Sequence, residues 1–219
     1  MLCAIFDLDG TLVDSLEDIA SALDRALVDH GLPRPALETV RTWIGGGARN
    51  LVEHAITASQ VDASRVDGVL ARFRVHYAAS PIVKTRLYPG IDAVLEQFVE
   101  AGVRLAVLTN KPHDLAVRIC GPLLAPWPFG AIVGQRDGIP MKPDPRAALA
   151  IATDLGVAPA DCVFIGDSDV DIATAHAAGM RAVGVSWGFR PRAELERARP
   201  SLILDEPIGL TRLLPPTPP

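Results

Sequence analysis

The sequence predicts an α/β protein with a Rossmann-like parallel sheet core and an α-helical cap inserted after the first strand. Two observations support this prediction. Short apolar runs, each long enough for one buried strand, alternate with amphipathic helical segments along most of the 219 residues. One long interval, residues 15–84, breaks the alternation and shows only helical patterns. We therefore expect a core formed by residues 1–14 together with 85–219, and a cap formed by residues 15–84.

Strands of the core are expected wherever a short apolar run lies between turn residues. These runs cover residues 2–6, 105–108, 131–133, 163–165, 182–185 and 202–204. Segments with apolar residues at i, i+3, i+4 and i+7 separate most of them, for example after Ile91 and after Pro145. This alternation favours parallel strands, whereas the proline-rich residues 215–219 predict a tail without regular structure.

Three helical stretches are expected in the cap. Their apolar faces cover residues 16–27, 51–56 and 66–77. Pro81 and the Pro89-Gly90 pair mark the return of the chain to the core. Three consecutive glycines, residues 45–47, stand between two of the helices. No Gly-Lys-Ser/Thr sequence follows them and no strand precedes them, so a flexible turn is a better interpretation than a phosphate-binding loop.

The composition argues against several classes of function. A formal net charge of -5 and a pI near 5.5 leave no basic stripe for the phosphate backbone of a nucleic acid. The chain reaches an acid at Asp7, too early for a signal peptide, and no apolar run has the length of a membrane span. Cys3, Cys120 and Cys162 are odd in number and far apart, which favours reduced, packed thiols in a cytoplasmic protein.

Residues able to do chemistry follow four of the predicted strands. They are Asp7-Leu8-Asp9-Gly10-Thr11, Thr109-Asn110-Lys111, Lys142-Pro143, and Gly166-Asp167-Ser168-Asp169 with Asp171. Each segment alone is compatible with a turn, a helix cap or a solvated charge. The carboxyl ends of parallel strands converge on one crevice, however, so the four segments together predict a single site.

The combination of these segments resembles the four motifs of the haloacid dehalogenase superfamily, and the resemblance covers nearly the whole chain. Within the superfamily the chain is most similar to the phosphoglycolate phosphatase branch. The segments that carry this similarity are Thr42-Trp43-Ile44-Gly45-Gly46-Gly47, Leu51-Val52-Glu53, Leu87-Tyr88-Pro89-Gly90, Leu108-Thr109-Asn110-Lys111-Pro112 and Phe164-Ile165-Gly166-Asp167-Ser168 with Asp171.

The resemblance implies a Mg²⁺-dependent phosphatase that hydrolyses a small phosphorylated metabolite, with 2-phosphoglycolate as the first candidate. Asp7 would accept the phosphoryl group as an aspartyl phosphate. Asp9 would protonate the leaving alkoxide and then activate water, and Lys142 would neutralise the charge on Asp7 and on the transferring group. An acid at Asp9 separates phosphatases from carbon–halogen hydrolases, because a halide needs no proton.

The same resemblance implies the binding residues. The metal would be held by Asp7, the backbone carbonyl of Asp9 and Asp167, with Asp171 and Ser168 supporting this set. Thr109 and the Asn110 amide would hold the phosphoryl oxygens.

In the cap, the glycine turn at Gly46 and the side chain of Arg49 would contact the leaving group. Arg49 could meet a substrate carboxylate, although an exposed arginine at a helix start is the more ordinary interpretation.

Several alternatives stay open at this point. The protein could be a broad sugar-phosphate or nucleotide phosphatase, or a β-phosphoglucomutase-like phosphotransferase. A receiver-like signalling module also clusters aspartates, a threonine and a lysine around Mg²⁺, but a large insertion after the first strand counts against it. A monomer and a homodimer are both compatible with the sequence.

Overall fold

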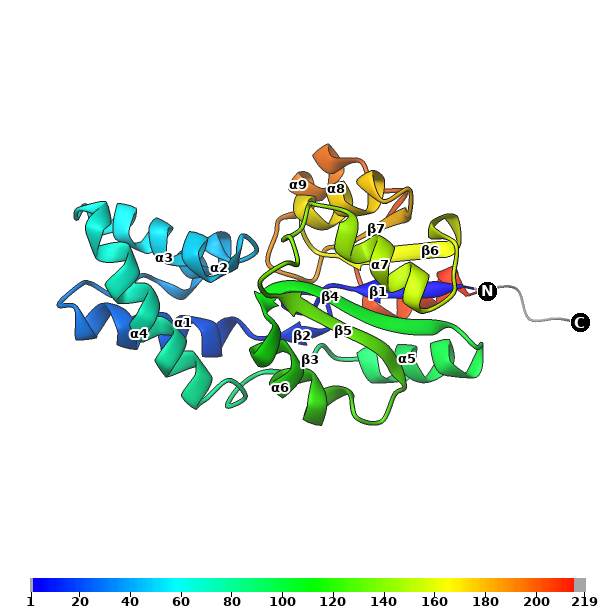
Figure 1. Ribbon diagram of the computed structural model, residues 1–219, viewed down its shortest axis with the longest axis horizontal. Coiled ribbons are helices and arrows are strands. Elements are labelled where there is room, and N and C mark those ends of the chain that lie inside the picture. The colour runs from blue at the N-terminus through cyan, green and yellow to red at the C-terminus, as the bar shows by residue number, and fades with distance from the viewer. Residues whose placement is uncertain (1, 215–219) are drawn as a thin grey trace, which may run out of the picture.

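The computed structural model describes residues 2–214, which form a sheet-containing core and a helical lobe (Figure 1). The core contains a six-stranded, all-parallel sheet with the order β5-β4-β1-β6-β7-β8. Its strands are β1 (Cys3–Phe6), β4 (Arg104–Pro112), β5 (Phe129–Gln135), β6 (Cys162–Gly166), β7 (Arg181–Val185) and β8 (Leu202–Leu204). The predicted fold class is therefore confirmed.

Helices cover both faces of this sheet. They are α5 (Ile91–Glu100), α6 (His113–Leu124), α7 (Arg146–Asp154), α8 (Asp169–Ala177) and α9 (Arg192–Ala198), with 3-10 turns η2 (Pro159–Asp161) and η3 (Pro207–Leu213). Successive side chains of a strand point to opposite faces. Ala4 and Phe6 accordingly join the apolar cluster of α5 and α6, whereas Cys3 and Ile5 join that of α7 and α8. The central strand β1 is thus buried on both sides.

The cap consists of α1 (Leu16–Asp29), α2 (Leu37–Trp43), α3 (Gly47–Ala58) and α4 (Val66–Ala79), with a 3-10 turn η1 (Ala63–Arg65). α1 packs along α4 and buries the expected apolar face, which includes Ile19, Leu23 and Leu27. The short helix α2 was not predicted. It has only seven residues, of which Val40 and Trp43 are buried, so it is too short to show a helical period.

The two connections between core and cap form a small antiparallel pair. β2 (Val13–Asp14) leaves the core and β3 (Arg86–Leu87) returns to it, with Val13 opposite Leu87. This pair lies beside the predicted boundaries at residues 14 and 85, which stay a prediction.

Within residues 2–214, no helix is long and apolar enough to cross a membrane. The predicted irregular tail, residues 215–219, lies outside the described residues.

One detail of the core differs from the sequence predictions. β4 continues through Thr109, Asn110 and Lys111, because these polar residues still lie in the sheet next to β5. Polarity there does not mark the end of the strand. Cys3 and Cys162 are far apart in sequence but lie opposite each other on β1 and β6, where both are buried free thiols.

Candidate active site

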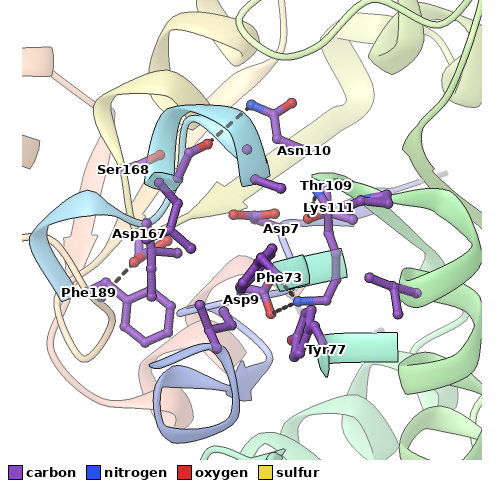
Figure 2. Close-up of a pocket in the computed structure, with 18 of the residues that line it drawn as sticks. Asp7, Asp9, Phe73, Tyr77, Thr109, Asn110, Lys111, Asp167, Ser168 and Phe189 are labelled. Atoms are coloured by element: carbon purple, nitrogen blue, oxygen red, sulfur yellow. Dashed lines mark hydrogen bonds and ion pairs between the residues drawn. The ribbon is translucent and has the colours of Figure 1, made fainter. Parts of the chain in front are cut away.

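The predicted chemical residues meet at the carboxyl end of the sheet, below the cap (Figure 2). β1 is followed by Asp7 and Asp9, β4 carries Thr109 and Asn110, and β6 is followed by Asp167. Because β1 lies between β4 and β6, these three strand ends are immediate neighbours.

Lys142 joins the site from the segment between β5 and α7. Its ammonium lies 2.8 Å from Asp7 Oδ1 and 2.6 Å from Asp171 Oδ1. Burial alone would lower the pKa of Lys142, but the two carboxylates outweigh it and raise the pKa above its ordinary value. Lys142 therefore stays charged at neutral pH and offsets part of the negative charge around Asp7.

Three buried carboxylates surround this lysine. Asp7, Asp167 and Asp171 each offer one oxygen, and these oxygens all lie within 4.8 Å of one another. Burial raises the pKa of Asp7 to about 6, with Lys142 acting against the shift and Asp171 adding to it. Burial and repulsion from Asp171 and Asp7 raise the pKa of Asp167 well above its usual range.

This surplus of buried negative charge fits a divalent cation. Lys142 pairs with two of the three carboxylates, Asp7 and Asp171, and hard cations such as Mg²⁺ prefer carboxylate oxygens. The backbone beside Asp167 is also shaped closely: Gly10 has φ 85°, and a Cβ there would lie 2.3 Å from Asp167 Oδ2. Any side chain at position 10 would collide with this carboxylate, so the position requires glycine.

The three carboxylates do not have equal freedom. Asp171 Oδ1 accepts a hydrogen bond from Lys142, and its Oδ2 accepts from the amide and hydroxyl of Ser168, at 3.1 and 2.6 Å. This capping box at the start of α8 fixes Asp171 in place. Asp167 accepts one bond, from the Phe189 amide at 2.7 Å, through its Oδ2. Asp7 and Asp167 thus have more freedom to bind a metal than Asp171, both of whose oxygens already accept hydrogen bonds.

Asp9 turns its side chain away from the acid cluster. Its carboxylate accepts hydrogen bonds from the Lys111 ammonium at 2.8 and 2.7 Å and from the Ser15 hydroxyl at 2.6 Å. The Lys111 side chain is 3% exposed, and its ammonium lies 4.6 Å from the centre of the Tyr77 ring (Figure 2). No role for Lys111 or Tyr77 was predicted from the sequence. The only signal for Lys111 was its place beside Thr109 and Asn110.

Asn110 connects the site to the cap. Its side-chain amide donates to the backbone carbonyls of Lys142, at 3.1 Å, and Gly45, at 3.3 Å, and its oxygen accepts from the Lys142 amide at 2.8 Å. Thr109 Oγ1 accepts from the Lys111 amide at 3.2 Å. Both residues are buried beside Asp7, as the sequence predicts for groups that meet a phosphoryl group.

Above these residues a pocket opens between core and cap. Its cap side is largely apolar and includes Ile19, Leu51 and Phe73. Gly45 and Gly47 of the glycine turn also line it, whereas Gly46 does not. Arg49 lies outside the lining, is 56% exposed and pairs with Asp67 and Glu53. The structure therefore does not bring Gly46 or Arg49 together with the other predicted residues.

A parallel sheet with a helical insertion after β1 thus brings four aspartates and Lys142 together at its carboxyl end, an arrangement that suits a hydrolase. Comparison with known proteins agrees. The family model described as haloacid dehalogenase-like hydrolase matches residues 4–185. The chain belongs to this family, on the branch of the phosphoglycolate phosphatase-like phosphoric monoester hydrolases.

The individual relatives cover nearly the whole chain. A phosphoglycolate phosphatase of Pseudomonas putida KT2440 is 40% identical over 96% of this chain and 78% of its own length. Phosphoglycolate phosphatase 1 of Pseudomonas aeruginosa is 38% identical, with the same coverage of 96% and 78%. The crystal structure of a predicted phosphoglycolate phosphatase from Haemophilus somnus 129pt superposes with a TM-score of 0.86 at 30% identity, covering 96% of each chain.

Proposed function

We propose that the protein is a Mg²⁺-dependent phosphatase that hydrolyses 2-phosphoglycolate through an aspartyl phosphate on Asp7. The observation that carries this proposal is the pair of carboxylates on one turn. Asp7 lies against Lys142 and Asp167, whereas Asp9, two residues on, lies at the pocket and pairs with Lys111. One carboxylate is thus placed to attack phosphorus and the other to handle a proton.

The first half of the reaction transfers the phosphoryl group. A carboxylate oxygen of Asp7 attacks phosphorus while the bond between phosphorus and the ester oxygen breaks, and the Asp9 carboxyl group gives its proton to the departing alkoxide. Lys142, Thr109 and the backbone amide of Asn110 hold the phosphoryl oxygens as charge develops on them.

The second half returns the enzyme to its starting state. The Asp9 carboxylate removes a proton from water, the water oxygen attacks phosphorus, and the bond from phosphorus to Asp7 breaks. Inorganic phosphate leaves, Asp7 is again a free carboxylate, and Asp9 again carries its proton.

The metal would be held by Asp7, Asp167 and the backbone carbonyl of Asp9. When bound, Mg²⁺ supplies positive charge that lets an anionic carboxylate approach a phosphate dianion. Asp171 stays behind these ligands and keeps Lys142 beside Asp7.

The names of the relatives support 2-phosphoglycolate, and the absence of a basic stripe in the sequence argues against a nucleic acid partner. Buried free thiols at Cys3, Cys120 and Cys162 support a cytoplasmic location, where thiols stay reduced. We expect a monomer or a homodimer.

A steady-state assay with Mg²⁺ tests the proposal. The protein should release inorganic phosphate over many turnovers, fastest from 2-phosphoglycolate and at a measurable rate from p-nitrophenyl phosphate. A receiver-like module would stop after one phosphorylation, and a phosphoglucomutase-like enzyme would return the phosphoryl group to a sugar phosphate. A broad phosphatase would show no preference for 2-phosphoglycolate over sugar phosphates and nucleotides of similar reactivity. Each of these three results would contradict the proposal.

A further inference from the structure

We propose that Lys111 is the residue that selects the substrate, by binding an anionic group on the alcohol part of the phosphomonoester. The substrate class it defines is the phosphate esters of short hydroxy acids, with the anion one or two carbons from the ester oxygen. This inference rests on the proposed function and names the group of the pocket that recognises its substrate.

The Lys111 ammonium lies near the position that the leaving group would occupy. Asp9 must reach the ester oxygen to protonate it, and Lys111 Nζ lies within 2.8 Å of both Asp9 oxygens. A cation this close to the proton donor is also close to the first carbons of the leaving group. An anion further along the alcohol would pass beyond Lys111.

The Lys111 ammonium is also buried, in surroundings that strengthen its bond to an anion. Lys111 lines the pocket and its side chain is 3% exposed, so a substrate anion that reaches it is largely removed from water. Its ammonium donates hydrogen bonds to both oxygens of Asp9 and also interacts with the Tyr77 side chain beside it. An ammonium has three donors, so a substrate carboxylate can share the Lys111 ammonium with Asp9 by taking the place of the Tyr77 side chain as its third partner. Charge-assisted hydrogen bonds in such surroundings are the strong ones.

The other cations around the pocket are less suited to this role. Arg190 donates to the backbone carbonyls of Thr42 and Ile44 and approaches Glu194 through its Nε. Arg74 lines the pocket but is exposed to solvent. Arg49, the residue that the sequence analysis considered for a substrate carboxylate, lies outside the lining. Lys111 alone combines burial with contact to Asp9.

The test compares 2-phosphoglycolate with ethyl phosphate, in which a methyl group replaces the carboxylate. Lys111→Met should lower the ratio of kcat/KM for 2-phosphoglycolate over ethyl phosphate by roughly 10- to 100-fold, the effect of one charge-assisted hydrogen bond. Any general damage to Asp9 affects both esters and cancels in this ratio. Lys84→Met is the matched control, because Lys84 is 61% exposed and lies outside the pocket lining, and it should leave the ratio unchanged.

Binding gives a second measurement that needs no turnover. In an Asp7→Asn background, calorimetry should show that Lys111→Met weakens binding of 2-phosphoglycolate by a similar factor but leaves binding of ethyl phosphate nearly as it was. Equal losses for both esters would overturn the proposal and make Lys111 a structural partner of Asp9. The proposal would also be overturned if Arg74→Gln lowered the ratio of kcat/KM for 2-phosphoglycolate over ethyl phosphate and Lys111→Met did not. That result would place the anion site on α4.

A substrate series with the unmodified protein covers the case in which Lys111→Met does not fold. kcat/KM should fall in the order 2-phosphoglycolate, 3-phosphopropionate, 4-phosphobutyrate, because each carbon carries the anion further from Lys111. A rate that rises along the series would contradict the inference but not the phosphatase activity. Failure to hydrolyse any of these esters or p-nitrophenyl phosphate would instead contradict the proposed function.

Discussion

Asp7 and Asp9 are two residues apart, but their carboxylates lie in different surroundings. Asp7 faces Lys142 and the buried aspartates, whereas Asp9 faces Lys111 and Ser15. Neighbouring carboxylates with separate partners can take separate roles, one as nucleophile and one as proton carrier. The turn after β1 thus supplies both groups that the proposed reaction needs.

Substitution of Asp9 tests its role directly. Asp9→Asn should lower the rate by about 10²–10⁴, the usual contribution of a positioned general acid–base group. The loss should be smaller for p-nitrophenyl phosphate, because p-nitrophenolate leaves without a proton. Steady-state rates for esters with leaving groups of increasing pKa measure this dependence, and an equal loss for all of them would make Asp9 a structural or metal-shell residue.

The acid cluster predicts a dependence on metal and on pH. EDTA should remove activity, Mg²⁺ should restore it, and Ca²⁺ should inhibit, since a larger ion with more ligands disturbs the in-line position of Asp7. Burial raises the pKa of Asp7 to about 6 and that of Asp167 well above its usual range, so protons compete with the metal below about pH 6. The half-saturating Mg²⁺ concentration should therefore rise as the pH falls from 7.5 to 5.5. Turnover in EDTA would contradict the assignment of Asp167.

The sequence predicted the core residues of the site but not their contacts. Asp7, Lys142 and Asp167 could be recognised because each follows a strand. The pair of Lys111 with Asp9 could not, because the two residues are 102 positions apart and meet only through the pairing of β1 with β4. Arg49 shows the opposite case. Its helix α3 lines the pocket with Ala48 and Leu51, so the helical period turns Arg49 away.

Among the elements, α1 is tied to the returning chain by one side chain. Asp18 accepts hydrogen bonds from the amides of Val83, Lys84 and Thr85, at 2.8 to 2.9 Å, and from the Thr85 hydroxyl at 2.7 Å. Burial would raise the pKa of Asp18, but these bonds outweigh it and lower the pKa. This clamp lies beside the β2–β3 pair, where the chain passes between core and cap.

Asp18→Asn should therefore lower the free energy of unfolding by about 1–3 kcal/mol at pH 7, because an amide cannot accept all four bonds. A group whose pKa is lowered by folding stabilises the folded state above its unfolded-state value of about 3.9, and this stabilisation is lost as the pH falls through the folded-state pKa. The difference between the two proteins should shrink below about pH 4. Urea unfolding at pH 7 and at a series of values from pH 4 down to pH 2 measures it, and a difference that stays constant along this series would rule out the charge as the cause.

A second tie joins the cap to the loop after β7. Arg190 donates hydrogen bonds to the carbonyls of Thr42 and Ile44, directly before the glycine turn. Because these bonds hold the turn beside the pocket, Arg190→Ala should raise KM for 2-phosphoglycolate several-fold, a modest effect for hydrogen bonds between a charged group and the backbone. Steady-state kinetics of Arg190→Ala and of Arg192→Ala measure the effect. Arg192 pairs with Glu196 and Asp205 away from the pocket and should not alter KM; equal KM changes would contradict the role of Arg190.

In the molecule as a whole, the core and the cap contribute different side chains to the pocket. In the proposed reaction, core residues around Asp7 meet the metal and the phosphoryl group, and the phosphoryl group is common to all phosphomonoesters. The cap lines the pocket above them with a largely apolar surface, and Lys111 also lines this pocket. The parallel core was predictable because short apolar runs alternate regularly with amphipathic helical segments in the sequence. The position of the cap turn against Arg190 and Asn110 was not, because those contacts join loops distant in sequence.

Trapping the covalent intermediate tests the central claim most directly. The protein is mixed with Mg²⁺ and 2-phosphoglycolate, quenched in acid during turnover and treated with borohydride, which reduces an acyl phosphate to an alcohol. Peptide mass spectrometry should then find homoserine at position 7 in the wild type and no homoserine in Asp7→Asn, which should also have lost turnover. Turnover without any reduced residue at position 7, or with the modification on another aspartate, would contradict the assignment of Asp7 as the phosphoryl acceptor.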